Sequence, residues 1–497
     1  MKCRTPFQKK SSKRYNQYDK SRKEERRREL PRRCFSRNIQ KRVPASTIPM
    51  NIQPRQEMTE ARRKVIELLD PGSFMEMGEH VSARLTDFYQ PGSVTESDGV
   101  ITGYGTIRGY LVFVFAQDSE VMGGTFGEQH GRKIVSLYEH AMLAKAPMIG
   151  LLDCQGFRIE EGLDGLNQFA RLYRVQSKAS GKIPQIMAVI GQCGGGMSIA
   201  AELADVTFIE EGKGKIFVNP QEVVGNAIGN NPYVEPTADG IYDWEEICDR
   251  IGRLVNILPP SSDFSPNIEE TSDEELNREC TDIRGMLGDA TAIFEELSDD
   301  HCILETRPDV GRDMVTGFIR IAGQPVGMIG CNTVFGEKRI TSDGCDKAAA
   351  MVEICDNFNS PILTITDTDG YQTTSHSEMY LPSAAGRLLK VLAKSSVPKI
   401  NLITGDVVGS AYSLLNSKGL SADFVFMWDT ADVSIVNPRQ ATEVIFGHYT
   451  RQLEQRYRED QSSALALARH GFANKVIAPE ETRKYLIGAL QTFVNSR

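Results

Sequence analysis

Two glycine-rich turns are the strongest candidates for a catalytic or binding site in this sequence. The first is Gly191-Gln192-Cys193-Gly194-Gly195-Gly196, which joins an apolar run typical of a buried strand to the start of a helical pattern. Glycine lets a ligand approach the backbone closely, and the first N–H groups of a helix have no partner within the helix. Such amides can hold an oxygen atom on which negative charge develops. The alternative interpretation is a tight turn that only packs the helix against the strand.

The second turn, Gly405-Asp406-Val407-Val408-Gly409-Ser410-Ala411, has the same kind of small-residue helix start, 214 residues further along the chain. A match of many residues at one constant offset indicates an internal duplication. Two copies of one fold, each with its own turn, suggest two oxyanion sites and two carbonyl substrates. The same offset relates Thr102-Gly103 to Thr316-Gly317, Gly109 to Gly323, Lys133 to Lys347, Pro147 to Pro361, Asp153 to Asp367, Gly156 to Gly370, Pro184 to Pro398, Gly191 to Gly405 and Gly195 to Gly409.

The elements that position these turns follow from the hydrophobic pattern, in which short apolar runs alternate with helical spacing. This alternation predicts an α/β fold with two tandem domains, at residues 58–300 and 301–497, and an acidic linker near 259–280. We expect strands at 112–115, 148–152, 185–190, 206–209, 362–365 and 399–403, and helices within 134–142, 195–203 and 351–358.

Charge is distributed unevenly along the 497 residues. Residues 1–49 hold 17 Lys and Arg against 4 Asp and Glu, which leaves 40 basic and 62 acidic residues in the rest of the chain. An acidic body is a poor nucleic-acid binder because phosphates repel it. We predict that residues 1–57 form a basic, disordered extension. It could be a nucleic-acid or membrane tail or an organelle presequence, or translation could begin at Met50.

Other classes of protein are disfavoured by features that the sequence lacks. No run approaches the ~18 uninterrupted apolar residues of a membrane span, so we expect a soluble, cytoplasmic protein. The cysteines form no C-x-x-C pair, so neither a zinc ribbon nor a dithiol redox site is expected, and no metal site is predicted. Cys154 and Cys193, which flank the first turn, are interpreted as small buried apolar residues.

Residues 60–490 resemble the carboxyltransferase (beta) subunit family of propionyl-CoA carboxylase, within the crotonase-like superfamily. The most specific stretch is Ala179-Ser180-Gly181-Lys182-Ile183-Pro184-Gln185-Ile186, which leads into the first turn. Further support comes from Gln117-Asp118, Gly123-Gly124, His130-Gly131 and Arg158-Ile159-Glu160-Glu161-Gly162, and in the second half from Val315-Thr316-Gly317, Asp346-Lys347-Ala348-Ala349, Val397-Pro398-Lys399-Ile400 and Gly409-Ser410-Ala411-Tyr412.

The resemblance implies two tandem crotonase-like domains and a reaction without a metal or a dedicated side-chain base. Carboxybiotin would lose CO2, and the resulting biotin enolate would take the α-proton of an acyl-CoA. By this analogy the N–H groups of Gly195 and Gly196 hold the thioester oxygen, and those of Ser410 and Ala411 hold the ureido oxygen of biotin. The cofactor-binding residues expected from the resemblance are Arg158, Gly156, Gly409 and Gly370. Family members form hexamers whose active sites combine halves of two subunits.

Three single positions depart from the family pattern, and the family's Val-Pro-Gly-Phe segment is Thr368-Asp369-Gly370-Tyr371 here. Ser410 replaces a glycine, Ser413 replaces an Asp associated with acyl-chain selection, and Asn437 stands near the second turn where the family has glycine. A backbone N–H donor survives the change from Gly to Ser. The departures therefore bear on which acyl-CoA is the substrate more than on the predicted reaction. Basic residues that could contact CoA phosphates are Arg158, Arg171, Arg174, Lys178 and Lys182, although a solvated basic face is the alternative.

The partners follow from motifs that are missing. The sequence has neither a Met-Lys-Met biotinylation motif nor a Walker A loop, so biotin is expected on another polypeptide, with biotin carboxylase and biotin carrier subunits as partners. The carboxyltransferase subunit of a sodium-pumping acyl-CoA decarboxylase of the methylmalonyl-CoA type is one alternative. A non-catalytic structural subunit of such a complex is another.

Overall fold

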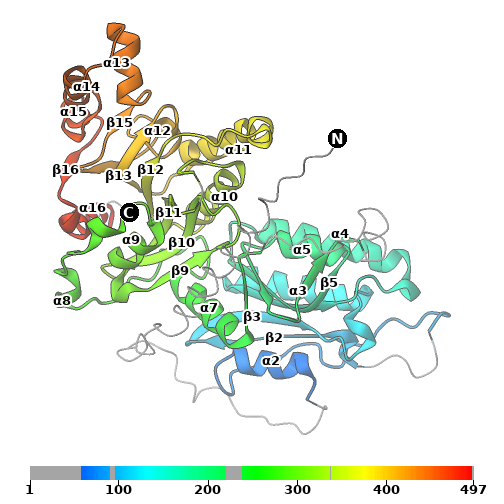
Figure 1. The fold of residues 1–497 in the computed structure, drawn as a ribbon. Helices are drawn as coiled ribbons and strands as arrows, with labels where there is room; N and C mark the ends of the chain where they lie inside the picture. The colour runs from blue at the N-terminus through cyan, green and yellow to red at the C-terminus, as the bar shows by residue number, and fades with distance from the viewer. Residues whose placement is uncertain (1–57, 90–95, 220–237, 336, 495–497) are drawn as a thin grey trace, which may run out of the picture. The chain divides into compact units, whose positions relative to one another are not determined.

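Two mixed β-sheets form the framework of the chain, each with eight strands among the described residues. The computed structural model describes residues 58–89, 96–219, 238–335 and 337–494 (Figure 1). The predicted basic extension at residues 1–57 lies outside the described residues. In the first sheet the strand order is β1-β2-β3-β4-β5-β6-β8, with β7 beside β5, and in the second it is β16-β14-β13-β12-β11-β10-β9, with β15 beside β13.

The strands of the first sheet are β1 (Met75–Glu76), β2 (Val100–Ile107), β3 (Tyr110–Gln117), β4 (Met148–Cys154), β5 (Gln185–Gly194), β6 (Val206–Glu210), β7 (Lys215–Phe217) and β8 (Gly240–Tyr242). Those of the second sheet are β9 (Ile303–Thr306), β10 (Met314–Ile321), β11 (Gln324–Cys331), β12 (Ile362–Thr368), β13 (Lys399–Val408), β14 (Phe424–Trp428), β15 (Val433–Ser434) and β16 (Lys475–Ile477). All six predicted strands lie within these elements.

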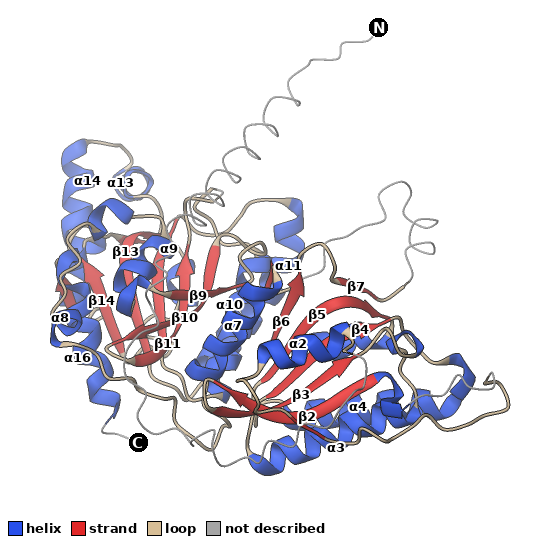
Figure 2. Ribbon diagram, turned by 90° about the horizontal axis from the view of Figure 1, so that it is seen from below, coloured by secondary structure: helices blue, strands red, loops and turns tan. Residues whose placement is uncertain are grey.

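The internal duplication is visible in the strand register. Met148 pairs with Gln185 across β4 and β5, and Ile362 pairs with Lys399 across β12 and β13, in each case 214 residues later. Both pairs of strands are parallel, and both lose register at the same place, between Leu152 and Cys154 in the first sheet and at the equivalent position in the second. The strands are buried and apolar because helices cover both faces of each sheet (Figure 2).

Helices α3 (Glu128–Ala144) and α4 (Leu163–Ala179) cover one face of the first sheet, and their buried side chains repeat every three to four residues. Helices α2 (Glu60–Leu68) and α7 (Trp244–Ile257) pack on the opposite face. The short α5 (Gly196–Glu202) follows the first glycine turn, in agreement with the predicted helix start.

In the second half, α10 (Ser342–Asn357) and α11 (Ser375–Lys394) occupy the places of α3 and α4. The second glycine turn is followed by α12 (Ala411–Leu414). The remaining helices are α8 (Asp273–Leu276), α9 (Ala290–Leu297), α13 (Pro438–Phe446), α14 (Arg451–Tyr457), α15 (Ala464–Arg469) and α16 (Thr482–Val494).

The position of helix α9 bears on where the second domain begins. Helix α9 lies before residue 301, yet its buried residues Ile293, Phe294 and Leu297 pack in the core of the second sheet. Residues 259–280, predicted as a linker, are mostly exposed and contain α8. We therefore propose that the second domain begins within this segment, because it is the last exposed stretch before the second core.

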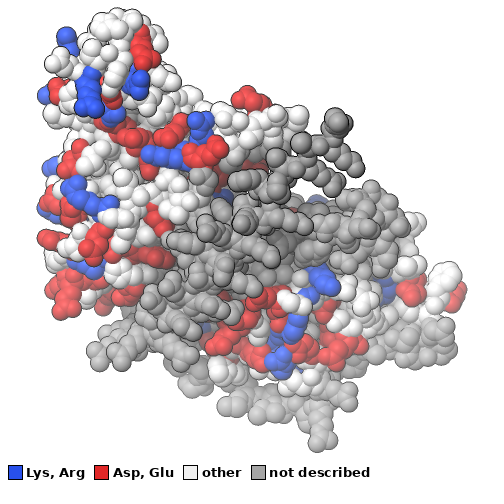
Figure 3. Space-filling view, viewed as in Figure 1, with Lys and Arg blue, Asp and Glu red and all other residues white. Residues whose placement is uncertain are grey.

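The described surface carries the acidic excess expected from the sequence. On the face shown in Figure 3, acidic side chains gather where α8 lies, and its first turn consists of Asp273, Glu274 and Glu275. None of the described helices is long and apolar enough to cross a membrane.

Candidate active site

The first glycine turn and the loop at Gly156 form an open site where β4 and β5 end. We call this site the first cradle. Cys154 pairs with Cys193 across the two strands, which places the loop at Gly156 beside the turn at Gly195. Both glycines have positive φ, +127° at Gly156 and +58° at Gly195, and a Cβ atom on either would meet no atom within 4 Å. Glycine is therefore needed here for its backbone conformation, and the space beside it is open.

Hydrogen bonding decides which amides of the first cradle can bind an oxygen. The Gly195 N–H donates to the carbonyl of Phe217 on β7, with an N to O distance of 3.0 Å. The N–H groups of Gly196 and Met197, at the start of α5, have no acceptor among the described residues. We therefore propose Gly196 and Met197 as the donor pair in place of the predicted Gly195 and Gly196, because the pairing of β7 with β5 occupies the Gly195 amide.

The second cradle repeats this arrangement at the ends of β12 and β13. Gly370 has a φ of +111° and Gly409 a φ of +70°, and a Cβ atom would come no closer than 3.5 Å to its nearest neighbour at either residue. The Gly409 N–H donates to the carbonyl of Ser434 on β15 at 2.8 Å. The N–H groups of Ser410 and Ala411, the donor pair predicted from the resemblance, have no acceptor among the residues described.

The shape of the first turn is fixed by Asp153 at the end of β4. One of its oxygens accepts a hydrogen bond of 2.9 Å from the Gln192 N–H, and the other accepts one from the Ser119 hydroxyl. These bonds brace β5 where it leaves register with β4.

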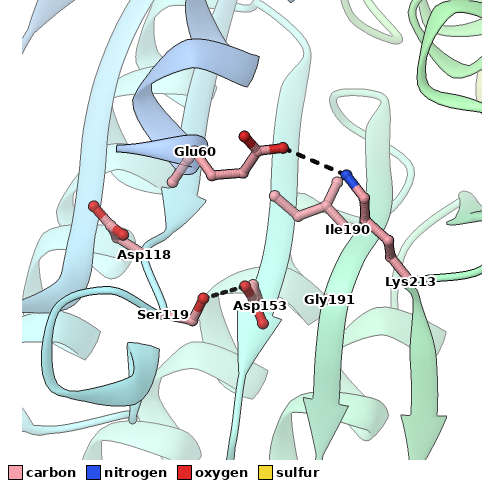
Figure 4. A pocket seen from close by; sticks show the side chains of 8 residues that line it. Glu60, Asp118, Ser119, Asp153, Ile190, Gly191 and Lys213 are labelled. Carbon is pink, nitrogen blue, oxygen red and sulfur yellow. Dashed lines mark hydrogen bonds and ion pairs between the residues drawn. The ribbon is translucent and has the colours of Figure 1, made fainter. Parts of the chain in front are cut away.

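Asp153 also lines a cavity of about 330 Å³ together with Glu60, Asp118 and Lys213 (Figure 4). The cavity includes Gly191, the first residue of the turn, but neither Gly156 nor Gly195 lines it.

Arg158, predicted to bind the cofactor, is buried in an ion-pair network. Its guanidinium contacts the Asp98 carboxylate and lies 3.0 Å from Glu161, and all three side chains are at most 1% exposed. Burial raises the pKa of Asp98, and the adjacent Arg158 opposes this shift. Because its guanidinium is occupied within the protein, Arg158 is suited to holding the loop before Gly162 in place, which argues against the predicted contact with CoA phosphates.

The other predicted side chains separate into buried and exposed groups. Cys154 and Cys193 are fully buried, and burial raises the pKa of the Cys154 thiol to about 11, so both behave as apolar packing residues. The basic residues of α4 and the following turn, Arg171, Arg174, Lys178 and Lys182, are exposed.

The three departures from the family pattern have different structural settings. Ser410 supplies one N–H of the second donor pair, and the residue is exposed. Ser413 is exposed, and its N–H donates to the Ser410 carbonyl. Asn437 caps α13 by accepting a hydrogen bond of 3.0 Å from the Arg439 N–H. Each departure is thus accommodated without closing the second cradle.

Sequence reasoning missed Met197, although the offset of 214 residues relates it to Ala411 and could have identified it. It also missed Tyr173 and Ser198, which contact the first turn from α4 and α5. No pattern in the sequence marks these two hydroxyls, because both lie on otherwise ordinary helix positions.

The duplicated α/β framework with one backbone cradle in each half defines the class of protein. The protein-family model described as "Carboxyl transferase domain" matches residues 54–497. The chain therefore belongs to the carboxyl transferase family, and it is a carboxyltransferase with two tandem crotonase-like domains.

Individual relatives are similar over most of their length. The chain is 30% identical over 465 residues to the propionyl-CoA carboxylase beta chain of Roseobacter denitrificans, covering 88% of this chain and 90% of that protein. It is 29% identical over 459 residues to the methylmalonyl-CoA decarboxylase subunit alpha of Veillonella parvula, with the same coverage. A crystal structure of the transcarboxylase 12S hexamer with methylmalonyl-coenzyme A bound has 27% identity and a TM-score of 0.82, covering 88% of this chain and 90% of that one.

Proposed function

We propose that this chain moves a carboxyl group between N-carboxybiotin and the α-carbon of a short-chain acyl-CoA. The observation that carries the proposal is the equivalence of the two cradles. Each pairs an open glycine with two adjacent N–H groups that lack an acceptor among the described residues. A reaction in which two different carbonyl oxygens become negatively charged in turn needs two such sites.

The amides of Gly196 and Met197 would donate to the thioester oxygen of the acyl-CoA. Negative charge grows on that oxygen when the α-proton is lost, and preorganised donors stabilise it more than they stabilise the neutral thioester. Removing a single such donor typically costs about 2.7–4 kcal/mol of transition-state stabilisation.

The second cradle fits the ureido oxygen of biotin. The space beside Gly370 and Gly409 is open, and the amides of Ser410 and Ala411 are available to one oxygen atom. Bound carboxybiotin supplies the carboxyl group. The residues of this chain would orient the ureido group and stabilise negative charge on its oxygen.

We infer that the chain acts in an assembly. The transcarboxylase 12S relative is a hexamer, and a homo-hexamer of this chain would bring the first half of one subunit to the second half of another. Biotin would arrive on a biotin carrier subunit, carboxylated by a biotin carboxylase subunit. The kinship with propionyl-CoA carboxylase beta chains supports the proposal of both partners.

A second candidate function is decarboxylation. The methylmalonyl-CoA decarboxylase subunits of Veillonella parvula and Propionigenium modestum are both 29% identical to this chain and cover as much of it as the carboxylase relatives do. The same two cradles would then receive the carboxyl group from a carboxyacyl-CoA and pass it to biotin, from which a membrane partner would release it.

The purified full chain tests both directions. We would incubate it with free biotin and a panel of carboxyacyl-CoA thioesters, and with carboxybiotin and the corresponding acyl-CoA thioesters, and follow carboxyl transfer with labelled carbon. Transfer with any thioester supports the proposal. A chain that neither transfers the label nor binds CoA thioesters would be a structural subunit, and the enzymatic proposal would be wrong.

A further inference from the structure

Both peptide groups that supply the amides of the first cradle accept a hydrogen bond from a side-chain hydroxyl. The Gly196 N–H shares its peptide group with the Gly195 carbonyl, which accepts a bond of 2.7 Å from the Ser198 hydroxyl. The Met197 N–H shares its peptide group with the Gly196 carbonyl, which accepts one of 2.7 Å from the Tyr173 hydroxyl. Each of the two available N–H groups therefore belongs to a planar peptide group whose carbonyl oxygen accepts a hydrogen bond from a side-chain hydroxyl.

A hydrogen bond to a carbonyl affects the N–H of the same peptide in two ways. It fixes the rotation of the rigid peptide plane, and it withdraws electron density from the amide nitrogen, which strengthens the N–H as a donor. Such cooperative strengthening amounts to roughly 10–30% per bond. A donor held in place before the reaction also needs no reorganisation when charge develops.

The position of Tyr173 is well defined by its surroundings. Its ring lies 5.9 Å from that of Phe169, which stacks on Phe126 with 3.9 Å between ring centroids. Burial raises the pKa of Tyr173, so its hydroxyl keeps the proton that it donates. A Cβ atom at Gly196 would lie 2.7 Å from this hydroxyl, so the close contact requires glycine there.

The second cradle lacks this feature. Its Gly409 carbonyl accepts from the Tyr412 N–H at 3.2 Å, just as the Gly195 carbonyl accepts from the Ser198 N–H, and its Ser410 carbonyl accepts from the Ser413 N–H at 3.0 Å. No side-chain hydroxyl donates to either carbonyl among the described residues. At the position equivalent to Tyr173, Arg387 instead pairs with Asp346 on α10.

We propose that Tyr173 and Ser198 are positioning residues that polarise the first cradle and not the second. They act through the backbone and touch no reacting atom. The inference rests on the proposed function, since it assigns the stronger donor pair to the oxygen of the acyl-CoA thioester and the weaker pair to the oxygen of biotin.

The role of Tyr173 and Ser198 can be tested with propionyl-CoA that carries carbon-13 at the thioester carbonyl. The quantity measured is the stretching frequency of this carbonyl when the thioester is bound. Stronger donors lower the stretching frequency, so the shift to low frequency on binding should be smaller in Tyr173→Phe and Ser198→Ala than in the wild-type chain. Ser198→Thr retains the hydroxyl and should restore the shift. Turnover should fall roughly three- to tenfold in each defective variant, as expected for one modest hydrogen bond. The Michaelis constant for free biotin should stay unchanged.

Tyr138→Phe is the matched control. It removes the hydroxyl of another buried tyrosine of the first half, which contacts Gln176 and not the cradle. Thermal unfolding of every variant checks the fold. If folded Tyr173→Phe and Ser198→Ala both show the wild-type carbonyl shift and turnover, the positioning inference is wrong while the proposed function stands. If the wild-type chain shows neither a carbonyl shift nor carboxyl transfer, the proposed function fails and this inference fails with it.

Discussion

At the scale of single residues, the backbone amide of Ser410 can be separated from its hydroxyl by mutation. Ser410 has a φ of −70°, which proline adopts without strain. Ser410→Pro therefore removes one N–H donor, and we expect turnover to fall about 100- to 1,000-fold. Ser410→Ala keeps the amide and should retain most activity. Carboxyl-transfer kinetics with matched unfolding midpoints check this, and equal activity of the two variants would exclude the Ser410 amide from the site.

Lys347 carries a second prediction at this scale. It is buried, its ammonium donates to the Met314 carbonyl at 2.8 Å, and burial lowers its pKa to about 8, partly opposed by Glu305 and Asp313. The unfolded chain keeps the proton of this ammonium up to about pH 10.5, whereas the folded chain loses it above about pH 8. The charged, buried lysine therefore destabilises the fold below about pH 8.

We expect the free energy of unfolding of the wild type to rise relative to Lys347→Met as the pH increases from about 8 to about 10.5. Urea unfolding of both proteins over this range measures the difference. Lys390→Met, which replaces an exposed lysine of α11, should show a constant difference from the wild type. A constant difference for Lys347→Met as well would contradict the prediction.

At the scale of elements, the Arg158 network connects loops from three parts of the first half. Arg158 contacts Asp98 before β2 and Glu161 before α4, and the Tyr89 hydroxyl donates to Glu161 at 2.7 Å. Arg158→Met leaves two buried carboxylates without their cation, which should destabilise the fold by about 3–5 kcal/mol.

The control is Arg387→Met, because Arg387 pairs with Asp346 at the surface, where both side chains are well exposed. That substitution should cost no more than about 1 kcal/mol. Chemical denaturation of both variants gives the two values. Similar losses would show that the Arg158 network does not hold these loops.

At the scale of the whole molecule, an active site that combines the first half of one subunit with the second half of another makes complementation possible. Two variants, each defective in a different cradle, should then regain activity when they assemble together. Gly196→Pro disables the first cradle, since it removes one donor and crowds the Tyr173 hydroxyl, whereas Ser410→Pro disables the second. When the two variants are co-expressed with different tags and purified through both, about a quarter of the sites should combine two intact halves at random assembly. Recovery of that activity supports shared sites. Co-expressed copies of a single variant should stay inactive, and no recovery in the mixed assembly would place both cradles of a site in one chain.

The sequence by itself was sufficient for the duplication, the α/β class and both glycine turns. These features depend on residue types that dictate local backbone conformation, such as the positive φ of Gly156, Gly195, Gly370 and Gly409, and they recur at one constant offset. The buried strands were predictable for the same reason, because parallel strands covered on both faces are continuous apolar runs.

Which amides and side chains remain available to a ligand depends on contacts between distant parts of the chain. The Gly195 amide is occupied because β7 pairs beside β5, and Arg158 is occupied because the chain brings Asp98 next to it from 60 residues away. Tyr173 reaches the Gly196 carbonyl across the packing of α4 on α5. Such partners are far apart in the sequence, and a hydrogen bond or ion pair depends on distances of a few ångströms that local patterns do not contain.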